Sequence, residues 1–184
     1  MFNKSKLIFT LVLILTLAFS TAFSFAAGGK TTGRKVPAYS SSQVTKLDLT
    51  KPSGVTYKEL ANASRFDTLD GLYAEFKRAE KKYRVNAVFL MALSIVESGG
   101  GQNMYRENNM FGYGGKNYRS KAAGIQDVAK GLSQNYLSEN GRYYKGKTIG
   151  AVNKYYCTSS IWTSKVATQM SYIYKNISKQ VANK

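Results

Sequence analysis

The chain has 184 residues, and its 27 lysines and arginines against 10 aspartates and glutamates give it a formal net charge of +17. It contains no histidine, which excludes serine–histidine triads, cysteine–histidine peptidase sites and HExxH zinc sites. Its one cysteine, Cys157, excludes an internal disulfide and a cysteine metal cluster. Any catalysis therefore depends on carboxylates, tyrosines, lysines and amides, and the sequence implies no metal and no cofactor.

Residues 1–26 are predicted to be a secretory signal. Lys4 and Lys6 precede an uncharged apolar run, and small residues up to Ala26 provide a cleavage site. The run of about 19 residues is also long enough for an uncleaved membrane anchor. In either case we expect the rest of the chain to act outside the cytoplasm, secreted or associated with the cell wall.

The strong positive charge predicts attraction to polyanions. An exported protein meets anionic lipids and the anionic polymers of a cell wall more often than nucleic acid, and no nucleic-acid recognition motif is present. The alternative is that the lysines serve solubility alone. We expect a monomer that binds no nucleic acid.

Residues 27–63 are predicted to be a basic linker rich in Ser, Thr, Lys and Gly. They contain both prolines of the chain and show little apolar periodicity, apart from one segment at residues 54–64 that could be ordered. Residues 64–184 are long enough for one domain and are predicted to be the catalytic domain.

The first two helices of this domain are predicted from caps and apolar spacing. One begins at Asp67 or Thr68 and the next follows the cap residue Asn86. The second of these helices, residues 87–98, is apolar on nearly every side. We therefore expect it to be the buried central helix of the domain.

Three further helices are predicted downstream. An amphipathic pattern covers residues 125–136, a short helix follows the cap residue Thr148, and the "CTSS" turn caps a final helix over residues 162–181. No strand-like alternation of useful length occurs, so the predicted fold class is mostly α.

Glu97 lies in the last turn of the predicted central helix, and after Ser98 the glycines Gly99–Gly101 follow. The partial negative charge of helix carbonyls and apolar surroundings would both raise the pKa of its carboxyl group. A carboxyl group that keeps its proton near neutral pH can act as a general acid. The alternative is a surface acid in a last turn that the glycines merely end, and spacing alone leaves both interpretations open.

Two motifs of the chain resemble the glucosaminidase family of bacterial cell-wall autolysins and flagellar peptidoglycan hydrolases. They are "LMALSIVESGGG" and, after a short polar spacer, "NNMFGYGG". The segments "YRSKAAGIQDVAKGLSQNYL" and "TIGAVNKYYCTSSIWTSKVATQMSYIYKNI" are also similar to family segments, so the likeness covers about residues 67–177. It implies a lysozyme-like helical fold and an endo-β-N-acetylglucosaminidase that acts on peptidoglycan glycan strands.

The resemblance also implies roles for individual residues. Glu97 would protonate the glycosidic oxygen, and Tyr156 would be the functional tyrosine near the reacting sugar. Substrate-binding positions implied by the family, or by aromatic stacking on sugars, are Asn109, Phe111, Gly112, Tyr113 and Trp162. For Phe111 and Trp162 the alternative is ordinary core packing.

The chain departs from the family in one respect. Many members have a β-hairpin lobe that supplies a second carboxylate, whereas residues 112–122 are too short for a long hairpin and contain no acid. We therefore predict a reduced or absent β-lobe. Two-carboxylate hydrolysis needs a partner about 5–5.5 Å or about 6.5–9.5 Å away. The candidates are Glu107 and Asp127, and the substrate's own N-acetyl group is a further alternative.

Two other functions remain open at this point. A lytic transglycosylase needs only one acid, because the 6-hydroxyl of muramic acid attacks internally. A non-catalytic module that binds the cell wall through basic and aromatic residues would bind without turnover.

Overall fold

The computed structural model describes residues 34–183, and helices are the only regular secondary structure in that range. The predicted signal and anchor segment lies outside the described residues. The elements are α1 (Ser41–Val44), α2 (Tyr57–Ala63), η1 (Asp67–Leu69), α3 (Tyr73–Tyr83), α4 (Ala87–Ser98), η2 (Tyr113–Gly115), α5 (Lys121–Gly131), η3 (Leu132–Leu137), α6 (Ile149–Tyr156) and α7 (Trp162–Ala182). The mostly α fold class is confirmed. None of the described helices is long and apolar enough to cross a membrane.

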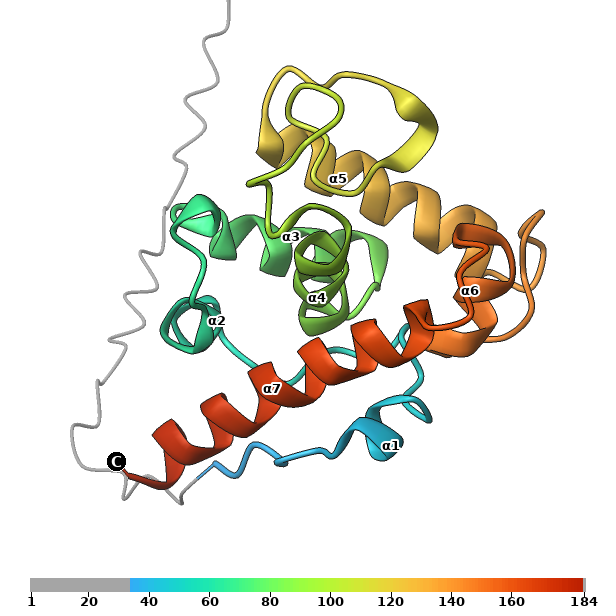
Figure 1. Cartoon of the computed structure of the whole chain (residues 1–184). Helices are drawn as coiled ribbons and strands as arrows, with labels where there is room; N and C mark the ends of the chain where they lie inside the picture. Colours follow the sequence, from blue (N-terminus) through green and yellow to red (C-terminus); the bar gives the residue numbers. More distant parts are fainter. Residues whose placement is uncertain (1–33, 184) are drawn as a thin grey trace, which may run out of the picture. The chain divides into compact units, whose positions relative to one another are not determined.

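Helix α4 is the centre of the fold, as its composition predicted. Ten of its twelve residues are buried, and α3 and α7 pack against it. Figure 1 shows α4 almost along its axis, with α7 running across below it. The helix begins where the Asn86 side chain accepts a hydrogen bond from the Phe89 N–H at 3.0 Å, which confirms the predicted cap.

The linker predicted for residues 27–63 is wrong for residues 34–63, which belong to the packed core. Their buried apolar side chains are Val36, Val44, Leu49, Val55, Leu60 and Ala63. The backbone is held as well, because the Leu49 N–H bonds to the Lys147 carbonyl and the Asn86 N–H bonds to the Leu49 carbonyl, each at 2.8 Å. The apolar residues are widely spaced, so burial is achieved without the periodicity that would have predicted it.

A buried carboxylate joins this segment to the helices. The Oε1 atom of Glu80 accepts the Ser53 N–H at 2.7 Å and the Ala87 N–H at 2.8 Å, and Oε2 pairs with Lys77. Burial by itself would raise the pKa of Glu80, but the Lys77, Ser53 and Ala87 bonds together lower the pKa below its ordinary value. Glu80 is thus held as a carboxylate that connects the start of α4 to residue 53.

Two predicted helix starts differ from the structure. The segment after Asp67 makes only the short turn η1, and Gly71 at φ +77° interrupts it before α3 begins at Tyr73. Helix α7 begins at Trp162 without a side-chain cap from the "CTSS" turn.

The other two helices follow the prediction more closely. Helix α5 begins at Lys121, earlier than expected, because Ser120 accepts the Ala123 N–H, and it continues into the π-helical turn η3. Thr148 caps α6 as predicted, accepting the Ala151 N–H at 3.3 Å. The sequence between η2 and α5 contains no strand, so no β-lobe is present in the described residues.

Candidate active site

The end of α4 is shaped by glycines with left-handed backbone. Gly99, at φ +64°, ends the helix with its N–H bonded to the Ile95 carbonyl at 2.9 Å. Gly101 is at φ +91°, and a Cβ there would lie 3.0 Å from Cγ of Met110. The Ser98 hydroxyl accepts the Gly101 N–H at 2.9 Å and donates to the Met110 carbonyl at 2.8 Å. The chain after Glu97 therefore folds back at once against the helix end.

Glu97 is half-buried at this helix end and bonded to the first residue of α7. The Trp162 indole N–H donates to Oε1 of Glu97 at 2.7 Å, and Trp162 is only 3% exposed. Burial raises the pKa of the Glu97 carboxyl group, and the indole hydrogen bond opposes part of that rise. Among the described residues no hydrogen bond reaches Oε2.

Glu97 differs from every other shifted acid of the chain. All ten acidic residues lie within residues 34–183. The other carboxyl groups with a shifted pKa all have it lowered: Asp48, Glu59, Glu80 and Asp127. A carboxyl group whose pKa is raised beside a groove is a candidate general acid, because it retains a proton where its neighbours do not.

Tyr156 stands beside this pair. Its hydroxyl donates to the Phe111 carbonyl at 3.0 Å, and its ring centroid lies 5.3 Å from that of Trp162. Burial and the negative charge of Glu97 raise the pKa of the Tyr156 hydroxyl well above its ordinary value. Tyr156 therefore stays neutral and connects the end of α6 to the loop that follows α4.

The loop at residues 109–116 is organised by a buried amide. Asn109, 2% exposed, donates to the carbonyls of Tyr113 and Lys116 at 2.9 and 2.8 Å. Its oxygen accepts the N–H groups of Phe111 and Tyr113 at 3.3 and 3.1 Å. Phe111 is 1% exposed and belongs to the core, while Gly112 turns the chain at φ +59°. Asn109 therefore holds the loop backbone together through its side chain, and Phe111 fixes the loop to the core.

This loop places the Tyr113 ring against the ring of Tyr156. Its ring stacks on Tyr156 with centroids 6.3 Å apart and an interplanar angle of 24°. Its hydroxyl end lies directly over Gly131 of α5, where a Cβ would come within 2.2 Å of the hydroxyl oxygen. Gly124, seven residues earlier on α5, similarly receives the loop, since a Cβ there would lie 2.9 Å from the Asn108 carbonyl.

Asp127 lies between these glycines in sequence and completes what we call the α5 seat: Gly124, Asp127 and Gly131. Asp127 accepts the Tyr118 hydroxyl at 3.0 Å and pairs with Lys116 at 2.7 Å. The Lys116 bond, opposed by partial burial, lowers the pKa of Asp127. This carboxylate is thus engaged in holding the loop.

Glu107 is exposed, and its side chain has no hydrogen bond among the described residues. No hydrogen bond joins the side chain of Glu107 or Asp127 to Glu97, although all three lie in the described part. Within residues 34–183 there is also no cluster of three or more cysteine or acidic side chains that could hold a metal ion.

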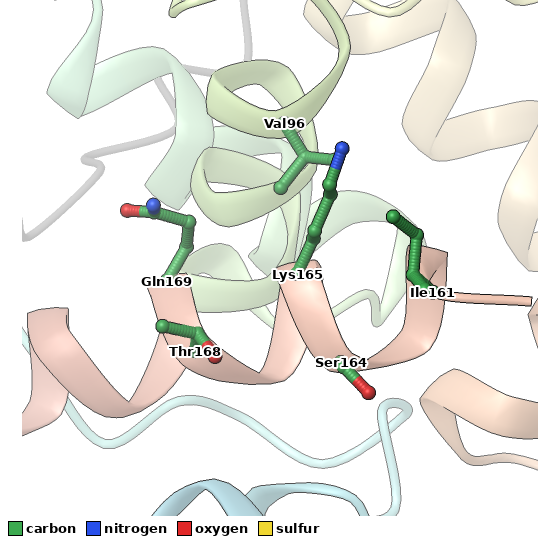
Figure 2. Close-up of a pocket in the computed structure, with 6 residues that line it drawn as sticks. All are labelled: Val96, Ile161, Ser164, Lys165, Thr168 and Gln169. Atoms are coloured by element: carbon green, nitrogen blue, oxygen red, sulfur yellow. The ribbon is translucent and has the colours of Figure 1, made fainter.

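A groove of about 400 Å³ is lined by residues next to Glu97 and Trp162 in the sequence. Figure 2 shows its lining side chains. It lies between the last turn of α4 and the first turns of α7. Its lining residues are Val96, Ile161, Ser164, Lys165, Thr168 and Gln169. Val96 precedes Glu97 and Ile161 precedes Trp162 in the sequence, so the groove lies one residue away from each member of the hydrogen-bonded pair.

The family model described as glucosaminidase, mannosyl-glycoprotein endo-beta-N-acetylglucosaminidase, matches residues 73–183, more than half of the chain. The chain belongs to the glucosaminidase family. The family's description names a glycoside hydrolase activity, as the sequence motifs implied.

Two relatives of this chain come from Streptococcus pneumoniae strains TIGR4 and R6. Each is named "Putative endo-beta-N-acetylglucosaminidase". Both are 27% identical over 146 residues, which is 71% of this chain but 22% and 21% of theirs. The chain therefore spans about a fifth of the length of these relatives.

Solved structures of Staphylococcus aureus autolysin E share the fold of the glucosaminidase chain. A catalytic mutant in complex with the disaccharide NAG-NAM has a TM-score of 0.61 at 21% identity, over 72% of each chain. A complex with the muropeptide NAM-L-Ala-D-iGlu also has a TM-score of 0.61, at 19% identity over 72% of each chain. The lysozyme-like helical fold is confirmed.

The glucosaminidase fold brings together Glu97, Tyr156, Trp162 and Tyr113 of the residues that the sequence suggested. Asn109, Phe111 and Gly112 lie in the loop that supports them, and neither Glu107 nor Asp127 shares a hydrogen-bond partner with Glu97. Sequence reasoning missed the α5 seat. Its one available signal was an unexplained glycine within a helix, which lowers helix propensity and usually has a packing reason.

Proposed function

We propose that the chain is an endo-β-N-acetylglucosaminidase that cleaves peptidoglycan glycan strands after N-acetylglucosamine, with Glu97 as general acid. The observation that carries the proposal is the raised pKa of Glu97, set against the lowered pKa of every other shifted carboxyl group. Family membership supports the reaction class. The sugars and muropeptide bound by autolysin E support the substrate class.

The geometry supports a direct proton transfer from Oε2. Trp162 occupies Oε1, so the carboxyl group is held in one orientation and the oxygen without a described hydrogen bond carries the proton. As the glycosidic bond between C1 and the leaving oxygen breaks, this proton passes to the leaving oxygen. The carboxylate that results is less well solvated than in water, which favours its reprotonation.

Tyr156 and Tyr113 have a supporting part in this proposal. The neutral Tyr156 hydroxyl is occupied by the Phe111 carbonyl, so it positions the loop and does not transfer a proton. The stacked tyrosine rings exclude water near Glu97 and present aromatic surface on which a sugar face can stack. We therefore regard Tyr156 as a positioning residue.

The nucleophile that attacks C1 is proposed to be the substrate's own acetamido group. Asp127 is engaged by Lys116 and Tyr118, and Glu107 is on an exposed loop, so no second carboxylate contacts Glu97. The acetamido oxygen would attack C1 as the glycosidic bond breaks, forming an oxazolinium ring. Water then opens the ring at C1, and its proton returns to Glu97, which restores the acid.

The same arrangement keeps lytic transglycosylation as the second candidate, because that reaction also needs one acid. The two reactions differ in product. Hydrolysis after N-acetylglucosamine leaves a reducing N-acetylglucosamine end, whereas transglycosylation leaves an anhydromuramic end.

The decisive experiment is mass spectrometry of peptidoglycan digested with residues 27–184 and then reduced with borohydride. Reduced N-acetylglucosamine ends that vanish with Glu97→Gln and persist with the matched variant Glu107→Gln support the proposal. Anhydromuramic ends would instead identify the reaction as lytic transglycosylation. Loss of products with Glu107→Gln assigns that residue as a second carboxylate, and wall binding with no products from the unaltered protein identifies a binding module.

We also propose export to the cell wall and attachment through the basic surface. The net charge of +17 supports this, and exposed charges are screened over about 10 Å at 0.1 M salt. Sedimentation with purified walls should therefore decrease as salt rises.

A further inference from the structure

The groove beside the Glu97–Trp162 pair has a composition unlike that of a sugar site. Its walls are the apolar side chains of Val96 and Ile161, and Ile161 is 55% exposed. None of its lining residues is aromatic. Sugars are usually held by stacking on aromatic rings, and the aromatic side chains near Glu97 are instead grouped around Tyr156. The groove is suited to a different part of the substrate.

Lys165 is the one ionisable side chain that lines the groove. Figure 2 shows it extending from α7 toward Val96 on α4. Among the described residues it has no acidic partner, since the five ion pairs involve other residues. Glu97 does not use this cation either, because burial and Trp162 account for the shift of its pKa. The groove thus combines a free positive charge with the apolar side chains of Val96 and Ile161.

The remaining lining groups are uncharged hydrogen-bonding side chains. Ser164 and Thr168 provide hydroxyls and Gln169 provides an amide, all on α7. These groups can bond to peptide N–H and carbonyl groups. A volume of about 400 Å³ lies at the lower end of the usual range for small-ligand pockets, about 300–1,000 Å³. Such a space fits a few amino-acid residues.

We propose that this groove binds the acidic stem peptide that a muramic acid beside the cleaved bond carries on its lactyl group. Lys165 pairs with a peptide carboxylate, Val96 and Ile161 contact the small apolar side chain, and Gln169 bonds to the peptide backbone. The proposal rests on the proposed function, because it assumes that Glu97 acts on peptidoglycan. A wall polymer of repeated phosphates would require a row of cations, which this groove does not provide.

The test compares two forms of one substrate, glycan strands with stem peptides and the same strands after an amidase has removed them. We expect Lys165→Gln to reduce kcat/KM about three- to tenfold on strands that bear peptides, as for a partly exposed charge pair. It should leave kcat/KM on bare strands unchanged. Lys175→Gln is the matched control, since Lys175 is an exposed lysine of the same helix that does not line the groove.

An equal loss on both substrates, or no loss on either, would overturn the stem-peptide assignment. If the unaltered protein cleaves neither substrate, the proposed function fails, and binding then tests the groove separately. Glu97→Gln should bind a disaccharide–dipeptide muropeptide more tightly than the bare disaccharide, and Glu97→Gln combined with Lys165→Gln should lose that difference. Equal affinities of Glu97→Gln for both ligands would exclude the groove as a peptide site.

Discussion

The indole N–H of Trp162 donates to a carboxylate oxygen of Glu97 at 2.7 Å, although 65 positions separate them in the sequence. Glu97 lies in the last turn of α4 and Trp162 is the first residue of α7. The bond therefore exists only when the central helix and the final helix are packed together. It sets both the orientation of the acid and, against the effect of burial, its pKa.

Replacing Trp162 by phenylalanine should move the pH dependence of activity. Loss of the indole bond removes the interaction that lowers the pKa of Glu97, so the acid stays protonated to a higher pH. The alkaline limb of the kcat/KM profile should shift upward. Tyr156→Phe retains the indole bond and should lower the rate without shifting that limb. A limb that stays in place in Trp162→Phe would show that the bond does not tune the acid.

Glu97→Gln should stabilise the folded protein near neutral pH while abolishing turnover. The folded pKa of Glu97 is raised above its ordinary 4.5, so the stability due to protonated Glu97 is complete below about pH 4.5 and lost as pH rises through the folded pKa. Glutamine has no such loss. Thermal unfolding should therefore give similar Tm values for both proteins at pH 4 and a higher Tm for Glu97→Gln at pH 7.5. A Tm difference that does not change with pH would contradict this explanation.

Asp127→Asn should destabilise the loop that Asp127 holds and should not remove a group that transfers a proton. The folded pKa of Asp127 is lowered chiefly by Lys116, so the stability it provides is present above pH 3.8 and lost as pH falls through the folded pKa. Because the pair is partly exposed, we expect a loss of less than about 1 kcal/mol in unfolding free energy. Activity should fall by less than about tenfold, whereas loss of a group that transfers a proton costs about 100- to 10,000-fold.

Tyr118→Phe removes the other bond to Asp127 and provides the comparison. Similar small losses in both variants indicate a shared role in holding the loop. A loss of 100-fold or more in Asp127→Asn alone would assign Asp127 as the second carboxylate.

Gly131→Ala should lower activity without destabilising the protein. Alanine normally stabilises a helix interior by about 1 kcal/mol relative to glycine, but its Cβ would lie 2.2 Å from the Tyr113 hydroxyl. Tyr113 must therefore move away from Tyr156, and KM for glycan strands should rise. Gly150→Ala is the matched control in α6, because a Cβ there meets nothing within 4 Å.

A double mutant separates this effect from a general one. In a protein that already carries Tyr113→Ala, the further change Gly131→Ala should leave KM unchanged. If the two losses of activity simply add, the glycine does not act through Tyr113.

The sequence predicted the features that depend on neighbouring residues. Asn86 and Thr148 cap helices as expected, because capping is a contact over three positions. Helix α4 is central because nearly all of its side chains are apolar, and this pattern requires burial on all sides. Glu97 could be located for the same reason, at the end of that helix.

The features that the sequence did not predict are contacts between distant segments. Leu49 is fully buried in a segment whose composition is that of a linker. The Trp162 bond could not be inferred from either residue alone, because it depends on how α7 crosses α4. Gly131 could be seen as an unusual residue in a helix, but its purpose became visible only with Tyr113 lying over it.

The packing of residues 34–63 into the core has a consequence for how far the protein can reach. If residues 1–26 remain as an anchor, only about seven residues, 27–33, separate it from the first described residue. Seven residues span at most about 25 Å, whereas a free linker over residues 27–63 would span about 120–130 Å when fully extended. An anchored form would be confined to glycan strands next to the membrane, and a released form would have access to the full thickness of the wall. Removal of the signal would thus decide which layer of the wall is cut.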